Sequence, residues 1–203
     1  MSSEISATEN TRGRPRSDQV DQAILRAASA LLAERGLDAM TIEDVATRAG
    51  VGKSSIYRRW PTKGTLALDA FLIDFLTQQP LVDNGTLEVD LREALTHWSA
   101  AVVGTPTGRA LVGLIAAAQF DKELSEGWIE RVMTPVREQH RTMVERAIER
   151  GEIPAGADVD VIMDLLYGAA YHRLLQGHLA ITPEFIELVA RMVAVGAKSG
   201  ATS

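Results

Sequence analysis

Apolar residues recur about every 3.6 positions along most of the chain, and this period limits the possible folds more than any other feature of the sequence. No run of alternating β-branched residues, which would indicate a β-strand, interrupts it. The fold class that we predict is therefore all-α. Because 46% of the 203 residues are apolar, the chain can bury a core of its own, and we expect about nine helices in two domains.

Three helices are predicted in the first third of the chain, at about residues 17–36, 41–50 and 53–60. Ser17 or Asp18 is suited to begin the first of them, and Gly36 to end it. Thr41 is expected to cap the second helix, and Gly50 to end it, because glycine readily adopts the left-handed conformation that follows many helices. A proline directly after the third helix stops its hydrogen bonding.

Six longer helices are predicted in the rest of the chain, at about residues 63–75, 91–102, 109–120, 126–150, 158–177 and 183–198. The first of these six is apolar nearly all round and is expected to be central. Pro135 either kinks the fourth or restarts it with Thr134 as the cap. Together these helices predict a C-terminal bundle.

The net charge of −6 is unevenly distributed along the chain. Residues 1–64 hold 10 Lys and Arg against 8 Asp and Glu, whereas residues 65–203 hold 11 against 19. Such asymmetry is a weak indication that the N-terminal part meets nucleic acid. We therefore expect a flexible basic arm at 1–16, a DNA-binding domain at 17–64, and a domain for ligand binding and dimerisation at 65–203.

The second and third predicted helices have the spacing of a helix-turn-helix unit, at about residues 41–60. Ala46 lies four residues before Gly50, and Ile56 lies six after it, so that a small residue permits close crossing and an aliphatic one locks the helices together. The other face of the third helix carries hydrogen-bond donors and cations, namely Lys53, Ser54, Ser55, Tyr57, Arg58 and Arg59. Because no acid occurs within 51–67, this face would attract phosphate.

Residues 41–60, followed by Lys63 and Leu66, closely resemble the signature of the TetR/AcrR family of transcriptional regulators. The resemblance extends over about residues 18–68 and departs at Trp60, where the family usually has phenylalanine; both rings can fill the same core position. It implies phosphate contacts from Thr41, Tyr57 and Lys63, and base-edge contacts from Lys53, Ser54, Ser55 and Arg58. Among these, Lys53 or Arg58 could read guanine.

The resemblance also implies a sequence-specific transcriptional regulator, in first place a repressor that binds palindromic double-stranded operator DNA as a homodimer. An apolar or amphipathic small molecule, bound in the C-terminal bundle, would act as effector by moving the helix at 66–75. The candidate interface residues on the last two helices are Gly168, Ala169, Leu188, Met192 and Val195. The candidate pocket residues, each of which could instead be core packing, are Phe75, Trp98, Phe120, Trp128, Met133, Met143, Tyr167, Tyr171 and His172.

Ahead of the first helix, residues 12–16 hold three arginines together with a glycine and a proline, which are expected to prevent a helix. Such a segment looks like the core of an AT-hook, which enters the narrow minor groove. Arg14 and Arg16 are therefore candidate DNA contacts, although a basic arm can also be a solubilising tail.

Other functional classes find little support in the sequence. The four histidines lack metal-ligand spacing, and neither a Gly-x-Ser-x-Gly elbow nor a phosphate-binding glycine loop occurs, so we expect no enzyme, no cofactor and no metal. An architectural DNA-coating protein would need a basic C-terminal part. A repressor without a ligand remains an alternative; it would have no cavity large enough for a small molecule.

The absence of cysteine fits a reducing compartment. Residues 1–11 are polar, unlike a signal peptide, and the longest apolar runs are too short to cross a bilayer. We therefore expect a cytoplasmic protein without membrane contact.

Overall fold

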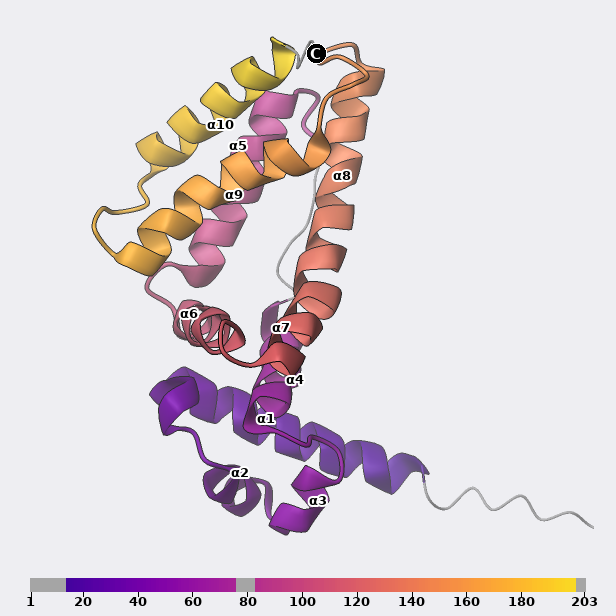
Figure 1. Cartoon of the computed structure of the whole chain (residues 1–203), viewed down its shortest axis with the longest axis vertical. Helices are drawn as coiled ribbons and strands as arrows, with labels where there is room; N and C mark the ends of the chain where they lie inside the picture. The colour runs from indigo at the N-terminus through magenta and orange to yellow at the C-terminus, as the bar shows by residue number, and fades with distance from the viewer. Residues whose placement is uncertain (1–13, 76–82, 200–203) are drawn as a thin grey trace, which may run out of the picture.

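The computed structural model describes residues 14–75 and 83–199, and within them the chain contains helices and no strand, so the all-α prediction is confirmed. The helices are α1 (Arg14–Ala39), α2 (Ile42–Ala49), α3 (Lys53–Tyr57), α4 (Lys63–Phe75), α5 (Leu87–Val102), α6 (Pro106–Ala118), α7 (Lys122–Trp128), α8 (Thr134–Glu149), α9 (Val159–Gln176) and α10 (Pro183–Lys198). A π-helical turn, Ile129–Met133, joins α7 to α8. Helices α1 to α3 lie at one end of the molecule, and α9 and α10 lie at the other (Figure 1).

The turn between α2 and α3 follows from local chemistry. Thr41 caps α2, because its side-chain oxygen accepts the backbone N–H of Asp44 at 3.1 Å. Gly50 ends α2 with φ 67°, in the left-handed region, and the N–H of Val51 donates to the carbonyl of Ala46 at 3.0 Å. The turn therefore forms as the spacing predicts, and it directs Ile56 of α3 into the core, where it is fully buried.

The start of α1 differs from the prediction. The helix begins at Arg14, three residues before Ser17, so the proline of the basic segment does not prevent helix there. Proline is compatible with a first turn, because the N–H that it lacks would have no partner inside the helix. At the other end, Gly36 (φ 77°, ψ 174°) breaks the helix where its end was expected, and a short helical stretch continues to Ala39.

The start of α6 is three residues earlier than predicted, because Thr105 caps it by accepting the N–H of Gly108 at 3.0 Å. Gly108 is required for a second reason, since a Cβ there would lie 1.8 Å from the carbonyl oxygen of Val102 at the end of α5. The two helices therefore approach each other across a tight turn that only glycine permits.

The long helix predicted at 126–150 begins earlier, after Asp121, which caps α7 by accepting the N–H of Leu124 at 3.0 Å. It runs through the π-helical turn into α8, and Pro135 is the second residue after that turn. A π-helical turn inserts an extra residue and loosens the backbone ladder. When α7 and α8 are counted as one helix around it, the described chain has the nine helices expected.

Helix α4 is central, as its apolar surface predicts. It contacts α1, α6 and α7, and its residues Leu66, Ala67 and Ala70 are fully buried. Together with α6, which also packs on α1, it joins the N-terminal unit to the bundle (Figure 1).

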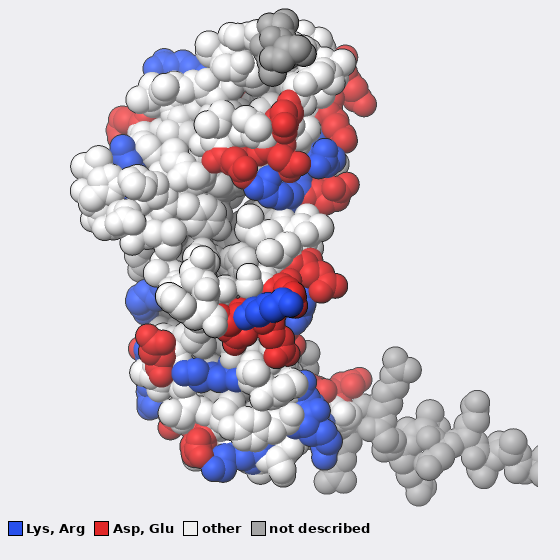
Figure 2. Space-filling model, viewed as in Figure 1, with Lys and Arg blue, Asp and Glu red and all other residues white. Residues whose placement is uncertain are grey.

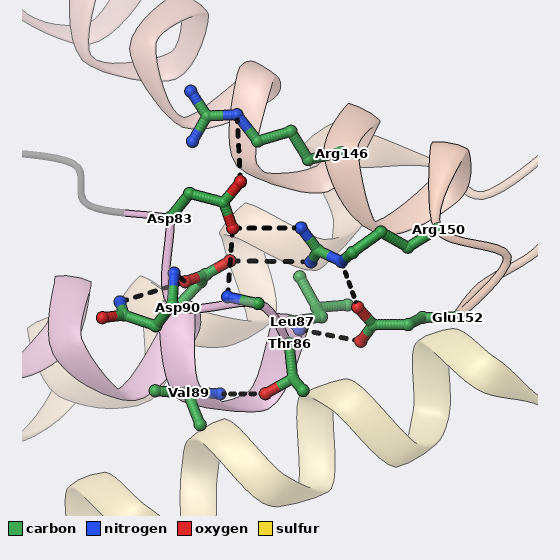
Figure 3. Close-up of polar contacts among 10 residues, drawn as sticks. Asp83, Thr86, Leu87, Val89, Asp90, Arg146, Arg150 and Glu152 are labelled. Carbon is green, nitrogen blue, oxygen red and sulfur yellow. Dashed lines mark hydrogen bonds and ion pairs between the residues drawn. The ribbon is translucent and has the colours of Figure 1, made fainter.

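A cluster of charged side chains ties the start of α5 to the end of α8 (Figure 3). Arg150 pairs with Asp83 at 3.2 Å and approaches the buried Asp90 at 3.7 Å. Glu152 accepts the backbone N–H of Leu87 at 2.8 Å and so satisfies one of the free donors at the start of α5. These bonds join α5 to α8, the helices that carry Trp98 and His140 respectively.

In the described residues no single helix is both long and apolar enough to span a membrane; α5 and α6 reach that length only together, across a bend of 93°.

Candidate nucleic-acid interface and ligand cavity

Helix α3 exposes the residues expected to meet DNA. Lys53, Ser54 and Arg58 are exposed, and Tyr57 is 50% exposed, whereas Ile56 between them is buried. In Figure 2, Lys and Arg side chains are prominent at the end of the molecule where α3 lies, with acids among them. A helix exposed in this way, on a rigid three-helix unit, can enter the major groove of DNA.

Lys53 and Ser55, two of the residues expected to contact base edges, already have partners within the N-terminal three-helix unit. Lys53 forms an ion pair with Glu43 of α2, and hydrogen bonding to Lys53 lowers the pKa of Glu43. The hydroxyl of the half-buried Ser55 accepts a hydrogen bond from Arg59 at 3.0 Å. Without DNA, therefore, Ser54, Tyr57 and Arg58 have the more open side chains.

The two predicted phosphate contacts outside α3 have internal roles as well. Thr41 is exposed at the N-cap of α2, and its hydroxyl also donates to Asp44 at 2.8 Å. The ammonium group of Lys63 donates to the carbonyls of Leu37 at 2.9 Å and Asp38 at 3.2 Å. Lys63 thus holds the end of α1 against the start of α4, a role that no local pattern could reveal.

The inclusion of Arg59 among the exposed cations is wrong. Arg59 is half-buried, forms an ion pair with Asp21 of α1, and donates to the hydroxyl of Ser17 at 3.3 Å. Its function is to fasten α3 to α1. The side chains of Arg14 and Arg16, the candidate contacts of the arm, lie outside the described residues.

A cavity of about 300 Å³ lies between α4, α5, α8 and α9. Its described lining consists of Phe75, Trp98, Val132, Met133, Val136, Arg137, His140, Met163, Asp164, Tyr167, Gly168 and Tyr171. The volume is at the lower end of the range found for small-molecule sites. Most of the wall is apolar or aromatic, with a few polar atoms on α8 and α9.

Five of the nine predicted pocket residues line this cavity: Phe75, Trp98, Met133, Tyr167 and Tyr171. The other four do not. Phe120 is 94% exposed, because α6 ends before it and it lies in the turn to α7. Trp128 is buried against Phe71 with ring centroids 5.8 Å apart, and Met143 is buried outside the cavity wall. His172 is exposed beside His178 instead.

The sequence did not single out the polar residues of the cavity, His140, Arg137 and Asp164. His140 is buried, and its Nδ1 lies 2.6 Å from the carbonyl oxygen of Val136 while its Nε2 lies 2.6 Å from the hydroxyl of Tyr167. Arg137 pairs with Asp160 at 2.9 Å and with Asp164. His140 and Arg137 lie on α8, whereas Tyr167, Asp160 and Asp164 lie on α9, so that only the fold brings these partners together.

Apolar side chains remain exposed along α9 and α10, at the end of the molecule opposite α3 (Figure 1). Leu188, Met192 and Val195 of α10 are 45%, 65% and 54% exposed, and Leu165 of α9 is 58% exposed. Gly168 is exposed and Ala169 is half-buried. In Figure 2 much of the surface at this end of the molecule is white, whereas acids and cations gather where α9 approaches α8.

A chain of contacts joins the cavity wall to the N-terminal unit. Asp69 of α4 accepts the indole N–H of Trp60 at 2.8 Å and forms an ion pair with Arg131 of the π-helical turn. The next two residues of that turn, Val132 and Met133, line the cavity. The chain is therefore Trp60, Asp69 and Arg131, and we refer to these three residues as the relay.

Among the described residues, no group of three or more His, Asp or Glu side chains is arranged to hold a metal ion.

Comparisons with known proteins agree with this geometry. Residues 24–70 match the family described as bacterial regulatory proteins, tetR family, and residues 81–193 match the tetracyclin repressor-like C-terminal domain. The chain is 36% identical over 82% of its length to the HTH-type transcriptional regulator YdeS of Bacillus subtilis, 84% of which is covered. It is 32% identical over 82% of its length to the DNA-binding transcriptional repressor TetR of Mycobacteroides abscessus, 85% of which is covered.

Among solved structures, the TetR family transcription regulator SCO0332 superposes with a TM-score of 0.76 at 32% identity, covering 88% of this chain and 98% of that one. The family consists of regulators rather than enzymes. Because both halves of the chain match it and the helix-turn-helix unit is formed, the chain belongs to the TetR family of DNA-binding transcriptional regulators.

Proposed function

We propose that this regulator is a homodimeric repressor, and that it leaves a palindromic operator when a small molecule occupies the cavity. The relative from Mycobacteroides abscessus is a transcriptional repressor, which supports repression rather than activation. The exposed apolar residues of α9 and α10 support a two-fold dimer, since a monomer rarely leaves such a face in water. In a dimer, two copies of α3 can reach two half-sites.

The observation that carries the effector part of the proposal is the position of α4. Its first residue, Lys63, holds the end of α1, and its last residue, Phe75, lines the cavity. Asp69 lies between them and contacts both Trp60 and Arg131. A ligand that displaces Phe75 or the π-helical turn would therefore shift α4, and with it the N-terminal unit.

A substitution that fills the cavity tests this mechanism without knowledge of the effector. Val136 lines the cavity, and Val136→Trp should occupy it as a ligand would. We expect operator affinity to fall about tenfold or more. That factor requires the filled cavity to favour the released state over the DNA-bound state by only about 1.4 kcal/mol. The operator is first obtained by selection from a random duplex pool, and the affinity is measured by fluorescence anisotropy.

Two further variants complete the experiment. Arg131→Ala in the Val136→Trp background should restore much of the affinity if the relay carries the signal, and Val103→Trp, at an exposed position outside the cavity wall, should have no effect. If the filled cavity instead raises operator affinity, the ligand favours the DNA-bound state and the release mechanism is wrong.

The ion pair between Lys53 and Glu43 gives a prediction for the DNA interface. Glu43→Gln should free Lys53 and remove a negative charge beside the reading helix, so operator affinity should rise about threefold to tenfold at low salt. Glu34→Gln is the matched control, since Glu34 pairs with Arg48 rather than with an expected DNA contact. Unchanged or weakened binding by Glu43→Gln would mean that Lys53 does not reach DNA.

A further inference from the structure

The cavity has a polar arrangement that selects for one chemistry of ligand, and this inference rests on the proposed function of the cavity as an effector site. The argument begins with His140. A backbone carbonyl can only accept, so the Nδ1 of His140, 2.6 Å from the carbonyl of Val136, carries the hydrogen. Burial lowers the pKa of His140, although the bond to Val136 opposes this effect, and the ring is neutral near pH 7.

The tautomer of His140 determines the role of Tyr167. Since Nδ1 holds the hydrogen of the neutral ring, Nε2 is an acceptor, and the hydroxyl of Tyr167 donates to it at 2.6 Å. Burial raises the pKa of Tyr167, so the phenol keeps its proton. With its hydrogen used in this bond, the Tyr167 oxygen can only accept a hydrogen bond from a ligand.

Tyr171, one helical turn further along α9, has the opposite capacity. The ring of Trp98 lies edge-on to that of Tyr171, with centroids 5.0 Å apart, and hydrogen bonding from Trp98 opposes the effect of burial on the pKa of Tyr171. Because an indole N–H can only donate, the phenol oxygen is the acceptor there. Burial raises the pKa of Tyr171, which therefore remains protonated. Its hydrogen has no acceptor among the described residues and is available to a ligand. The cavity thus offers one acceptor and one donor on the same helix.

The charges around the cavity do not favour an ionic ligand. Arg137 is the only cation in the described lining, and it is already paired with both Asp160 and Asp164. A carboxylate ligand would approach two acids and a neutral imidazole, and would lose its hydration without gaining a free cation. An ammonium group would have to compete with Arg137 for the same acids.

The remaining walls fit a flat apolar body. The ring of Trp98 meets the rings of Tyr167 and Tyr171 edge-on, with centroids 6.0 Å and 5.0 Å apart, and methionines supply adaptable surface nearby. We propose that the cavity binds a neutral aromatic molecule carrying one hydroxyl group, which donates to Tyr167 and accepts from Tyr171. The volume of about 300 Å³ suits a molecule of one or two rings.

Four naphthalene derivatives test the proposal by calorimetry with the full chain at pH 7, in the absence of DNA. They are 1-naphthol, 1-methylnaphthalene, 1-naphthoate and 1-naphthylmethylammonium. We expect 1-naphthol to bind about 100-fold more tightly than 1-methylnaphthalene, because two hydrogen bonds contribute about tenfold each. The two ions should bind more weakly than 1-naphthol.

Variants locate the selectivity. Tyr167→Phe or Tyr171→Phe should each reduce the preference for 1-naphthol over 1-methylnaphthalene to about tenfold, and the double variant should reduce it to near unity. Phe120→Ala, at a side chain that is 94% exposed, should keep the full preference. Thermal unfolding of each variant identifies any loss of fold, and the single variants keep the test valid if the double variant does not fold.

Equal binding of 1-naphthol and 1-methylnaphthalene, tighter binding of either ion, or binding of none of the four at millimolar concentration would overturn the proposal. These outcomes are independent of the release mechanism, because no DNA is present. If 1-naphthol binds with the expected selectivity yet does not lower operator affinity, the ligand class stands and the proposed release fails.

Discussion

Replacing Lys53 and Arg58 together by alanine should reduce affinity for the selected operator about 1,000-fold. A dimer would present four such side chains to its two half-sites, and four contacts of about 1 kcal/mol each amount to about that factor. Both residues are exposed, Lys53 on α3 and Arg58 directly after it, and Arg58 has the more open side chain because Lys53 is paired with Glu43. The measurement is anisotropy with labelled duplex at two salt concentrations.

A scrambled duplex of the same length separates base recognition from phosphate attraction. If Lys53 and Arg58 read bases, affinity for the scrambled duplex should fall much less than affinity for the operator. Equal losses on both duplexes would reduce the two residues to phosphate contacts. Lys122→Ala with Lys198→Ala removes the same charge from exposed positions in the bundle, and this control should leave operator affinity nearly unchanged.

The helices of the N-terminal unit were predictable because their signals are local. Thr41 caps a helix by bonding to a residue three positions away, and Gly50 ends it through its own backbone conformation. The same holds for the turn that positions Ile56. Where a local signal misled, at the start of α1, proline was interpreted as a helix breaker although a first turn accepts it.

Roles that depend on tertiary contact were not predictable. Arg58 and Arg59 are neighbours with similar flanking residues in the sequence. Only the packing of the N-terminal unit shows that Arg59, and not Arg58, pairs with Asp21 of α1. Lys63 likewise caps a helix that ends 24 positions earlier in the chain. The periodicity of a helix shows which face is buried, but not which distant group the face meets.

The cavity also combines features that the local sequence predicts with features that depend on tertiary contacts. Trp98 and Trp128 both lie at inward positions of apolar helices, yet one borders the cavity and the other packs against Phe71. An inward aromatic side chain is compatible with both outcomes, because periodicity measures burial and not the space left between helices. The hydrogen bond between His140 and Tyr167 spans 27 positions in the chain. The chemistry of the ligand therefore emerges only from the folded arrangement.

Replacing Leu188 and Met192 of α10 by glutamate should convert the protein from a dimer into a monomer. Both side chains are exposed in the protomer, at 45% and 65%, so the substitutions should leave its fold intact. In a two-fold interface each substitution occurs on both sides and brings like charges together. Light scattering after size-exclusion chromatography measures the mass, and circular dichroism checks the helical content.

The monomer should also lose operator binding by about a factor of 100 to 10,000. A dimer converts its second half-site contact into an intramolecular event, and this gain disappears when the subunits separate. Phe120→Glu places a charge on an exposed apolar residue of the bundle outside α9 and α10, and it should remain dimeric with full affinity. If the Leu188 and Met192 double variant stays dimeric, the subunits associate through another surface. If it is monomeric but binds the operator as tightly as the original protein, recognition does not require two copies of α3.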